Sequence, residues 1–69
     1  MSYNRRKVLS ALRRRGVTVL REGGRHTLVG SADGKQSSVP RHNELARGTV
    51  RGIAEQLGID WETLKKDLA

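Results

Sequence analysis

A first helix is predicted over residues 4–15, because apolar side chains recur there at three- and four-residue spacing. Ser2 or Asn4 is suited to cap its start, since a short polar side chain accepts hydrogen bonds from the unpaired N–H groups of the first turn. Gly16 is suited to its end. The apolar stripe consists of Val8, Leu9, Ala11 and Leu12.

Short runs rich in β-branched residues follow, separated by turn signals, and they predict a three-stranded antiparallel meander. The adjacent Gly23 and Gly24 suit a tight reversal, and Asp33-Gly34 is a second turn signal. Pro40 has no N–H group to donate, so it belongs at a strand end or an edge. The predicted strands cover residues 17–22, 26–30 and 36–40.

Residues 41–48 are polar and are predicted to form an ordered loop. Thr49 is then a suitable N-cap for a second helix, which Gly58 ends, and Asp60 caps a short last helix. The elements follow the order α-β-β-β-α, with the short helix appended. This order predicts a single α+β domain over residues 1–69, in which a layer of helices covers one face of the sheet. The apolar sides of the two later helices are Val50, Ile53, Ala54 and Leu57, then Trp61, Leu64 and Leu68.

Positive charge is concentrated in residues 1–51, which carry twelve Lys and Arg against three Asp and Glu. Residues 52–69 carry two Lys and Arg against four Asp and Glu. The 69-residue chain as a whole has a net charge of +7. This division into a basic segment and a shorter acidic segment indicates a polyanionic partner for the basic one, most often nucleic acid. The absence of cysteine excludes disulfides and thiolate metal sites. No apolar run approaches membrane-spanning length, so a cytoplasmic protein without a membrane partner is predicted.

His26 is the first candidate for chemistry, because an imidazole suits RNA cleavage without a metal. In that reaction a base removes the proton from a 2′-OH, which attacks the adjacent phosphate while cations stabilise the developing charge. A free histidine side chain titrates at a pH of about 6.5, so much of it is neutral in the cell. Arg25 is adjacent, and Lys35 and Arg41 are expected nearby on neighbouring segments. His26 shares a strand face with Leu28, and a structural histidine in a hairpin fits the same residues.

Two other groups of basic residues are candidate phosphate contacts. Arg41 and His42 follow the third strand and can bind phosphate or supply an acid, although such a polar loop can also cap its own backbone. Arg5, Arg6 and Lys7 fall in the first turn of the first helix, where positive charge is unfavourable. This placement favours an anionic partner, and a solvated helix face is the alternative. The spacing of the two histidines matches no common metal site, so no metal or other cofactor is predicted.

Residues 53–64 offer a competing interpretation, since their pattern is that of a helix-turn-helix. A small residue, Ala54, precedes a glycine turn at Gly58 and an apolar residue, Ile59. The polar positions of the following helix carry a net negative charge, whereas a recognition helix normally meets phosphates with positive charge. A tight corner between two helices accounts for the same residues.

Three motifs occur in order along the chain: Gly24-Arg25-His26, then Val-Pro-Arg-His at 39–42, then a Gly-Thr that opens the helix ending at Leu57-Gly58-Ile59. Together they resemble the HicA (YcfA-like) family of small toxins, the messenger-RNA-cleaving half of a toxin–antitoxin pair. The resemblance implies a fold like that of double-stranded-RNA-binding domains, ribosome-independent cleavage of RNA, and inhibition by a HicB-type antitoxin that masks the site. The family's catalytic histidine falls on His26. The family commonly has Gly-Ser-His, often with a second histidine next, where this chain has Arg25 and Thr27.

The sequence therefore predicts an endoribonuclease with His26 as general base and with RNA and a HicB-type antitoxin as partners. Arg25, Lys35 and Arg41 are predicted to contact phosphate or stabilise charge, and His42 is the weaker candidate for the acid. Two alternatives stay open at this stage. One is a basic RNA-binding module without catalytic activity, and the other is a helix-turn-helix DNA-binding protein.

Overall fold

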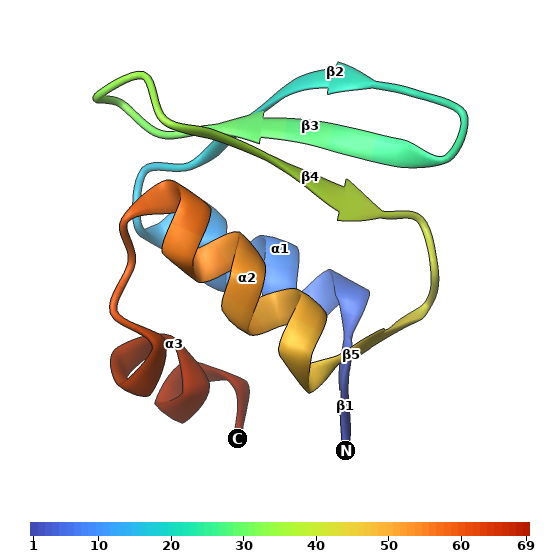
Figure 1. Ribbon diagram of the computed structural model, residues 1–69, viewed down its shortest axis with the longest axis vertical. Helices are drawn as coiled ribbons and strands as arrows, with labels where there is room; N and C mark the ends of the chain where they lie inside the picture. Colours follow the sequence, from blue (N-terminus) through green and yellow to red (C-terminus); the bar gives the residue numbers. More distant parts are fainter.

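Three antiparallel strands form the main sheet of the computed structural model, which describes residues 1–69 (Figure 1). The central strand is β3, and both turns lie where the glycine pair and the Asp-Gly signal predict them. The meander is therefore confirmed, and its first strand begins one residue later than predicted. The strands are β2 (Thr18–Glu22), β3 (His26–Gly30) and β4 (Gln36–Pro40).

Two helices, α1 (Arg5–Arg14) and α2 (Arg47–Leu57), lie on the same side of this sheet (Figure 1). The third helix, α3 (Trp61–Leu68), packs against both of them, on the side away from the strands. The predicted α+β arrangement of the double-stranded-RNA-binding type is thus confirmed. None of these helices has the length and apolar content needed to cross a membrane.

The predicted apolar stripes of the three helices, except the partly buried Leu9, join residues from the strands and loops in one core of fourteen buried side chains. Every residue of β2 is exposed, so within the main sheet only β3 and β4 add to the core, through Val29 and Val39. The helices cover one face of the sheet, and the opposite face of β3 and β4 stays open to solvent. The core consists of Val8, Ala11, Leu12, Val17, Val29, Val39, Leu45, Val50, Ile53, Ala54, Leu57, Trp61, Leu64 and Leu68.

A second, two-stranded sheet lies outside the predicted elements. In it β1 (Ser2–Asn4) pairs antiparallel with β5 (Glu44–Ala46), and Tyr3 lies opposite the buried Leu45. The loop predicted over 41–48 is therefore wrong, since its second half is β5 and the start of α2. Strands of three residues are too short for the alternation of apolar and polar residues to be visible in the sequence.

The N-cap predicted at Thr49 is also wrong. Helix α2 begins at Arg47, after an extended Ala46 that has no capping side chain. The strand β5 runs directly into the helix, and the Arg47 N–H donates to the carbonyl of Met1 at 3.3 Å. The pairing of the two short strands, rather than a polar side chain, therefore fixes where α2 begins.

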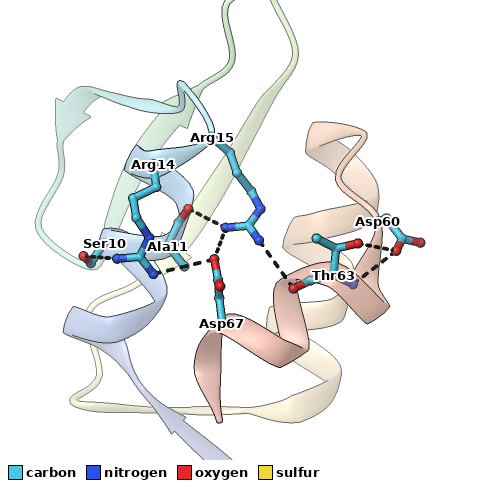
Figure 2. Close-up of polar contacts among 7 residues, drawn as sticks. All are labelled: Ser10, Ala11, Arg14, Arg15, Asp60, Thr63 and Asp67. Atoms are coloured by element: carbon cyan, nitrogen blue, oxygen red, sulfur yellow. Dashed lines mark hydrogen bonds and ion pairs between the residues drawn. The ribbon is translucent and has the colours of Figure 1, made fainter.

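The caps predicted at Asn4, Gly58 and Asp60 are confirmed, whereas α1 ends at Arg14 with Arg15 as its C-cap, one residue before Gly16. The side chain of Asn4 accepts a hydrogen bond from the Lys7 N–H at 3.2 Å, which caps α1. Asp60 caps α3 by accepting from the backbone N–H of Thr63 at 3.1 Å and from its hydroxyl at 2.8 Å (Figure 2). Gly58 ends α2 in the left-handed conformation, with φ at +72°, which glycine adopts at little cost.

Asp67 attaches α3 to the end of α1 (Figure 2). The Nη1 atom of Arg15 donates to Asp67 Oδ2 at 2.6 Å and to the Ala11 carbonyl at 2.9 Å, and Arg14 Nη2 lies 3.6 Å from the same carboxylate. The polar side of α3 is thus partly occupied by α1. This arrangement favours a corner between packed helices over a recognition helix that must be free to enter DNA.

Replacing Asp67 by asparagine is expected to destabilise the fold at neutral pH and to have no effect in strong acid. The hydrogen bond from Arg15 holds the pKa of this carboxyl below its ordinary value of 3.8. The stabilisation is therefore present above the ordinary pKa and is lost as the pH falls through the lowered one. Thermal unfolding at neutral pH and at about pH 2 checks this expectation.

The matched control is Glu62→Gln, which removes an exposed ion pair with Lys65 inside the same helix. Exposed pairs of this kind contribute little, so its Tm is expected to stay near the parent value at neutral pH. If Asp67→Asn lowered the Tm equally at both pH values, the ionised Asp67 carboxylate would not be the source of the stabilisation.

Candidate active site

His26 is the first residue of β3 and follows directly from the turn at Gly23–Arg25. Its side chain is exposed and makes no hydrogen bond within the protein, whereas the next residue, Thr27, is fully buried. The predicted alternation is confirmed: His26 and Leu28 face away from the helices, and Thr27 and Val29 face the core. The imidazole therefore stands on the open face of the sheet.

The turn before His26 requires a glycine. The Gly23 N–H donates to the His26 carbonyl at 2.8 Å, and a Cβ atom at Gly23 would lie 2.8 Å from that same oxygen. Such an approach is closer than real Cβ contacts allow. Gly23 thus permits the tight reversal that places the imidazole at the start of the strand, whereas Gly24 has room for a Cβ and no positive φ.

Arg41 lies across this turn, as predicted. Its backbone N–H donates to the Arg25 carbonyl at 3.1 Å, and its Nη1 atom donates to the Gly23 carbonyl at 3.0 Å. The register of β3 and β4 places His26 opposite Pro40, one residue before Arg41. A hollow of about 460 Å³ is lined by Gly24, Arg25, His26, Arg41 and His42. Two guanidinium groups and two imidazoles therefore share one solvent-accessible hollow, and four predicted site residues come together.

Lys35 does not join them, so its predicted proximity to His26 is wrong. Gly30 pairs with Gln36, which puts the hairpin containing Lys35 at the far end of β3 from His26. Four residues of strand separate the two positions, roughly 13 Å. The Lys35 ammonium lies 3.3 Å from Asp33 in its own turn. In an antiparallel hairpin the turn lies at the far end from the two free ends, so Lys35 in the turn is far from His26, whereas Arg41 after β4 is near it.

The basic residues at the start of α1 have different surroundings. Arg5 is turned toward the sheet, where its Nη2 donates to Thr27 Oγ1 at 2.6 Å and its Nε donates to the Pro40 carbonyl at 3.0 Å. These contacts give Arg5 a structural role that explains its position in the first turn. Arg6 and Lys7 are exposed on the helix, outside the hollow that contains His26.

Two residues that sequence reasoning missed connect Arg5 to Arg41. The buried hydroxyl of Thr27 accepts from Arg5 and donates to Glu22 Oε1 at 2.6 Å. Glu22 Oε1 in turn lies 3.5 Å from Arg41 Nη1. The chain Arg5–Thr27–Glu22–Arg41 therefore links α1 to the guanidinium beside His26. The signal available in the sequence was a threonine on the core-facing side of β3, where an apolar residue is expected.

A second hollow, also of about 460 Å³, borders His26 on its other side. It runs along the edge strand β4, where side chains of the open face of β3 and β4 come next to α2, and we call it the β4–α2 groove. Apart from His26, none of its lining side chains is charged. The lining residues are His26, Leu28, Gln36, Ser37, Ser38, Pro40, Gly48, Thr49, Gly52, Ile53 and Gln56.

Comparison with known proteins supports one family. No curated protein matches the chain. The family model described as HicA toxin of bacterial toxin–antitoxin matches residues 5–59, which span α1, the meander, α2 and the glycine corner after it. Because this match covers most of the chain and fits the confirmed fold, the protein belongs to the HicA family of toxins of bacterial toxin–antitoxin systems.

Proposed function

We propose that this HicA-family toxin is a metal-independent endoribonuclease with His26 as its general base. The observation that carries the proposal is an exposed imidazole, free of internal hydrogen bonds, in one hollow with Arg25 and Arg41. RNA supplies its own nucleophile in the 2′-OH, so the protein needs only a base, an acid and positive charge near the phosphate. The net charge of +7 favours an RNA backbone as the ligand.

In the proposed reaction His26 removes the proton from the 2′-OH, and the 2′-oxygen attacks the neighbouring phosphorus. The bond to the 5′-oxygen breaks, which leaves a 2′,3′-cyclic phosphate on one fragment and a free 5′-OH on the other. Arg25 and Arg41 bind the non-bridging oxygens, where charge develops in the transition state. His42, which lines the same hollow, protonates the leaving oxygen.

The substrate class proposed here is cytoplasmic messenger RNA, and the proposed regulator is a HicB-type antitoxin that covers the same hollow. Toxin–antitoxin membership supports a protein partner in general. A partner with acidic side chains fits the positive surface around His26 and competes with phosphate for it.

The test is the chemistry of the product ends. The purified protein is incubated with RNA in excess chelator, and the fragments are analysed by mass spectrometry. We expect 2′,3′-cyclic phosphate and 5′-OH ends, because only attack by the 2′-OH forms the cyclic product. If the protein binds RNA but leaves it intact, the nuclease proposal is wrong and the protein is an RNA-binding module without catalytic activity.

A further inference from the structure

The β4–α2 groove differs in chemistry from the hollow on the other side of His26. The hollow holds Arg25, Arg41 and His42, whereas the groove has neutral walls. A nucleotide has the same division, with a charged phosphate at one end and an uncharged, hydrogen-bonding base at the other. A phosphate placed beside Arg41 therefore leaves the adjoining base next to the groove.

Two glycines keep the groove open. Gly48 and Gly52 lie one turn apart in α2, and a Cβ atom at either position would meet no other atom within 4 Å. Neither has a positive φ, so no backbone conformation requires glycine there. Glycine inside a helix is less favourable than alanine. Neither packing nor backbone geometry explains this pair, and its effect is a bare helix surface facing the groove.

The walls carry polar groups that have no partner within the protein. The hydroxyls of Ser38 and Thr49 and the amide of Gln36 make no internal hydrogen bond, although all three line the groove. Gln56 is held in place because its Oε1 accepts from the buried Ser37 hydroxyl. Its amide nitrogen makes no internal hydrogen bond. Such groups match the edges of an unstacked base, which proteins read by hydrogen bonds in single-stranded RNA.

The groove also has apolar surface and sufficient size. Leu28 and Pro40, both partly exposed on the open face of the sheet, give a base apolar surface to lie against. The volume of about 460 Å³ lies in the range of small-ligand sites.

We propose that the β4–α2 groove binds the base of the nucleotide adjoining the cleaved phosphate in single-stranded RNA, and that Ser38 and Gln56 set the nucleotide preference. This inference rests on the proposed nuclease function and deepens it. The groove selects the base, while the hollow on the other side of His26 binds the phosphate.

The test uses Gly52→Leu and an RNA pool with random sequence around the cleavage site. The new side chain fills the groove without removing any contact, and leucine favours the helix, so the variant is expected to fold. Sequencing of the fragment ends should show a base preference next to the cut for the parent. For Gly52→Leu we expect at least about tenfold slower cleavage at the preferred sites and a flattened preference.

The matched control is Glu55→Leu, which adds the same side chain to an exposed position of α2 outside the groove. It is expected to keep the parental base preference. A second variant, Ser38→Ala, removes one unpartnered hydroxyl from the wall and is expected to shift the preference at a single nucleotide.

The outcomes separate the two proposals. If the parent cleaves and Gly52→Leu keeps both its rate and its preference, the groove assignment is overturned and the nuclease stands. If Glu55→Leu alters the preference as strongly as Gly52→Leu, the groove assignment also fails, because the effect then belongs to α2 as a whole. If the parent forms no cyclic-phosphate ends, both proposals fall.

Discussion

Replacing His26 by alanine is expected to slow RNA cleavage by about 10²- to 10⁴-fold, the usual contribution of a positioned general base. The fold should be unaffected, because the side chain is exposed and has no hydrogen-bond partner within the protein. RNA affinity should change little, since the guanidinium groups of Arg25 and Arg41 remain. The measurements are the initial rate of cyclic-phosphate formation, the Kd for RNA at fixed salt, and the Tm.

His42→Ala is the natural comparison, because the second histidine of the chain lines the same hollow. If His26→Ala cleaved RNA at the parental rate while His42→Ala did not, the base would have to be reassigned to His42. Equal retention of activity by both variants would remove histidine from the mechanism altogether.

Replacing Thr27 by valine is expected to lower the free energy of unfolding by about 1–3 kcal/mol, although the two side chains have nearly the same shape. The hydroxyl accepts from Arg5 and donates to Glu22, so its removal leaves a partly buried guanidinium without that acceptor. In a domain of this size each 1 kcal/mol corresponds to a fall in Tm of about 4–8 °C. Thermal unfolding at neutral pH gives the measurement.

Thr18→Val is the matched control, because Thr18 is exposed at the start of β2 and makes no side-chain hydrogen bond. It is expected to change stability by less than about 0.5 kcal/mol. Equal effects of the two substitutions would show that the chain from Arg5 to Arg41 adds nothing to the fold. Because Glu22 also meets Arg41, Thr27→Val should reduce the cleavage rate as well.

The meander and the cores of the three helices could be predicted because each carries a local signal. Apolar residues at helical spacing identified α1 and α2, and glycine turns separated the strands. Asp60 was recognisable as a cap from its chemistry, and Asn4 was one of the two candidates for the first helix. The same locality singled out His26, since a turn precedes it and the alternation after it puts it on one face with Leu28, although only the structure shows that this face is the open one.

The remaining features depend on contacts between distant parts of the chain. No local pattern at residues 44–46 predicts a strand, because the strand forms only by pairing with β1 at the start of the chain. The orientation of Arg5 follows from the hydroxyl of Thr27 and the carbonyl of Pro40, which only the folded chain brings to it. The β4–α2 groove likewise needs the sheet and the helix together.

Thr27 accounts for one departure from the family pattern. It occupies the position where the family often has a second histidine, and it is fully buried and hydrogen-bonded on both sides. A threonine here contributes to the interior and not to the hollow that contains His26. The exchange therefore leaves the exposed imidazole of His26 and its cationic neighbours unchanged.

The pairing of the first strand with the fifth has a consequence for synthesis on the ribosome. β1 emerges early, yet its partner β5 and the helix that follows it are translated only after all three strands of the main sheet. Until then a nascent chain already displays His26 but lacks the second wall of the groove beside it. The proposed nuclease therefore lacks one wall of the groove beside His26 until α2 has been synthesised.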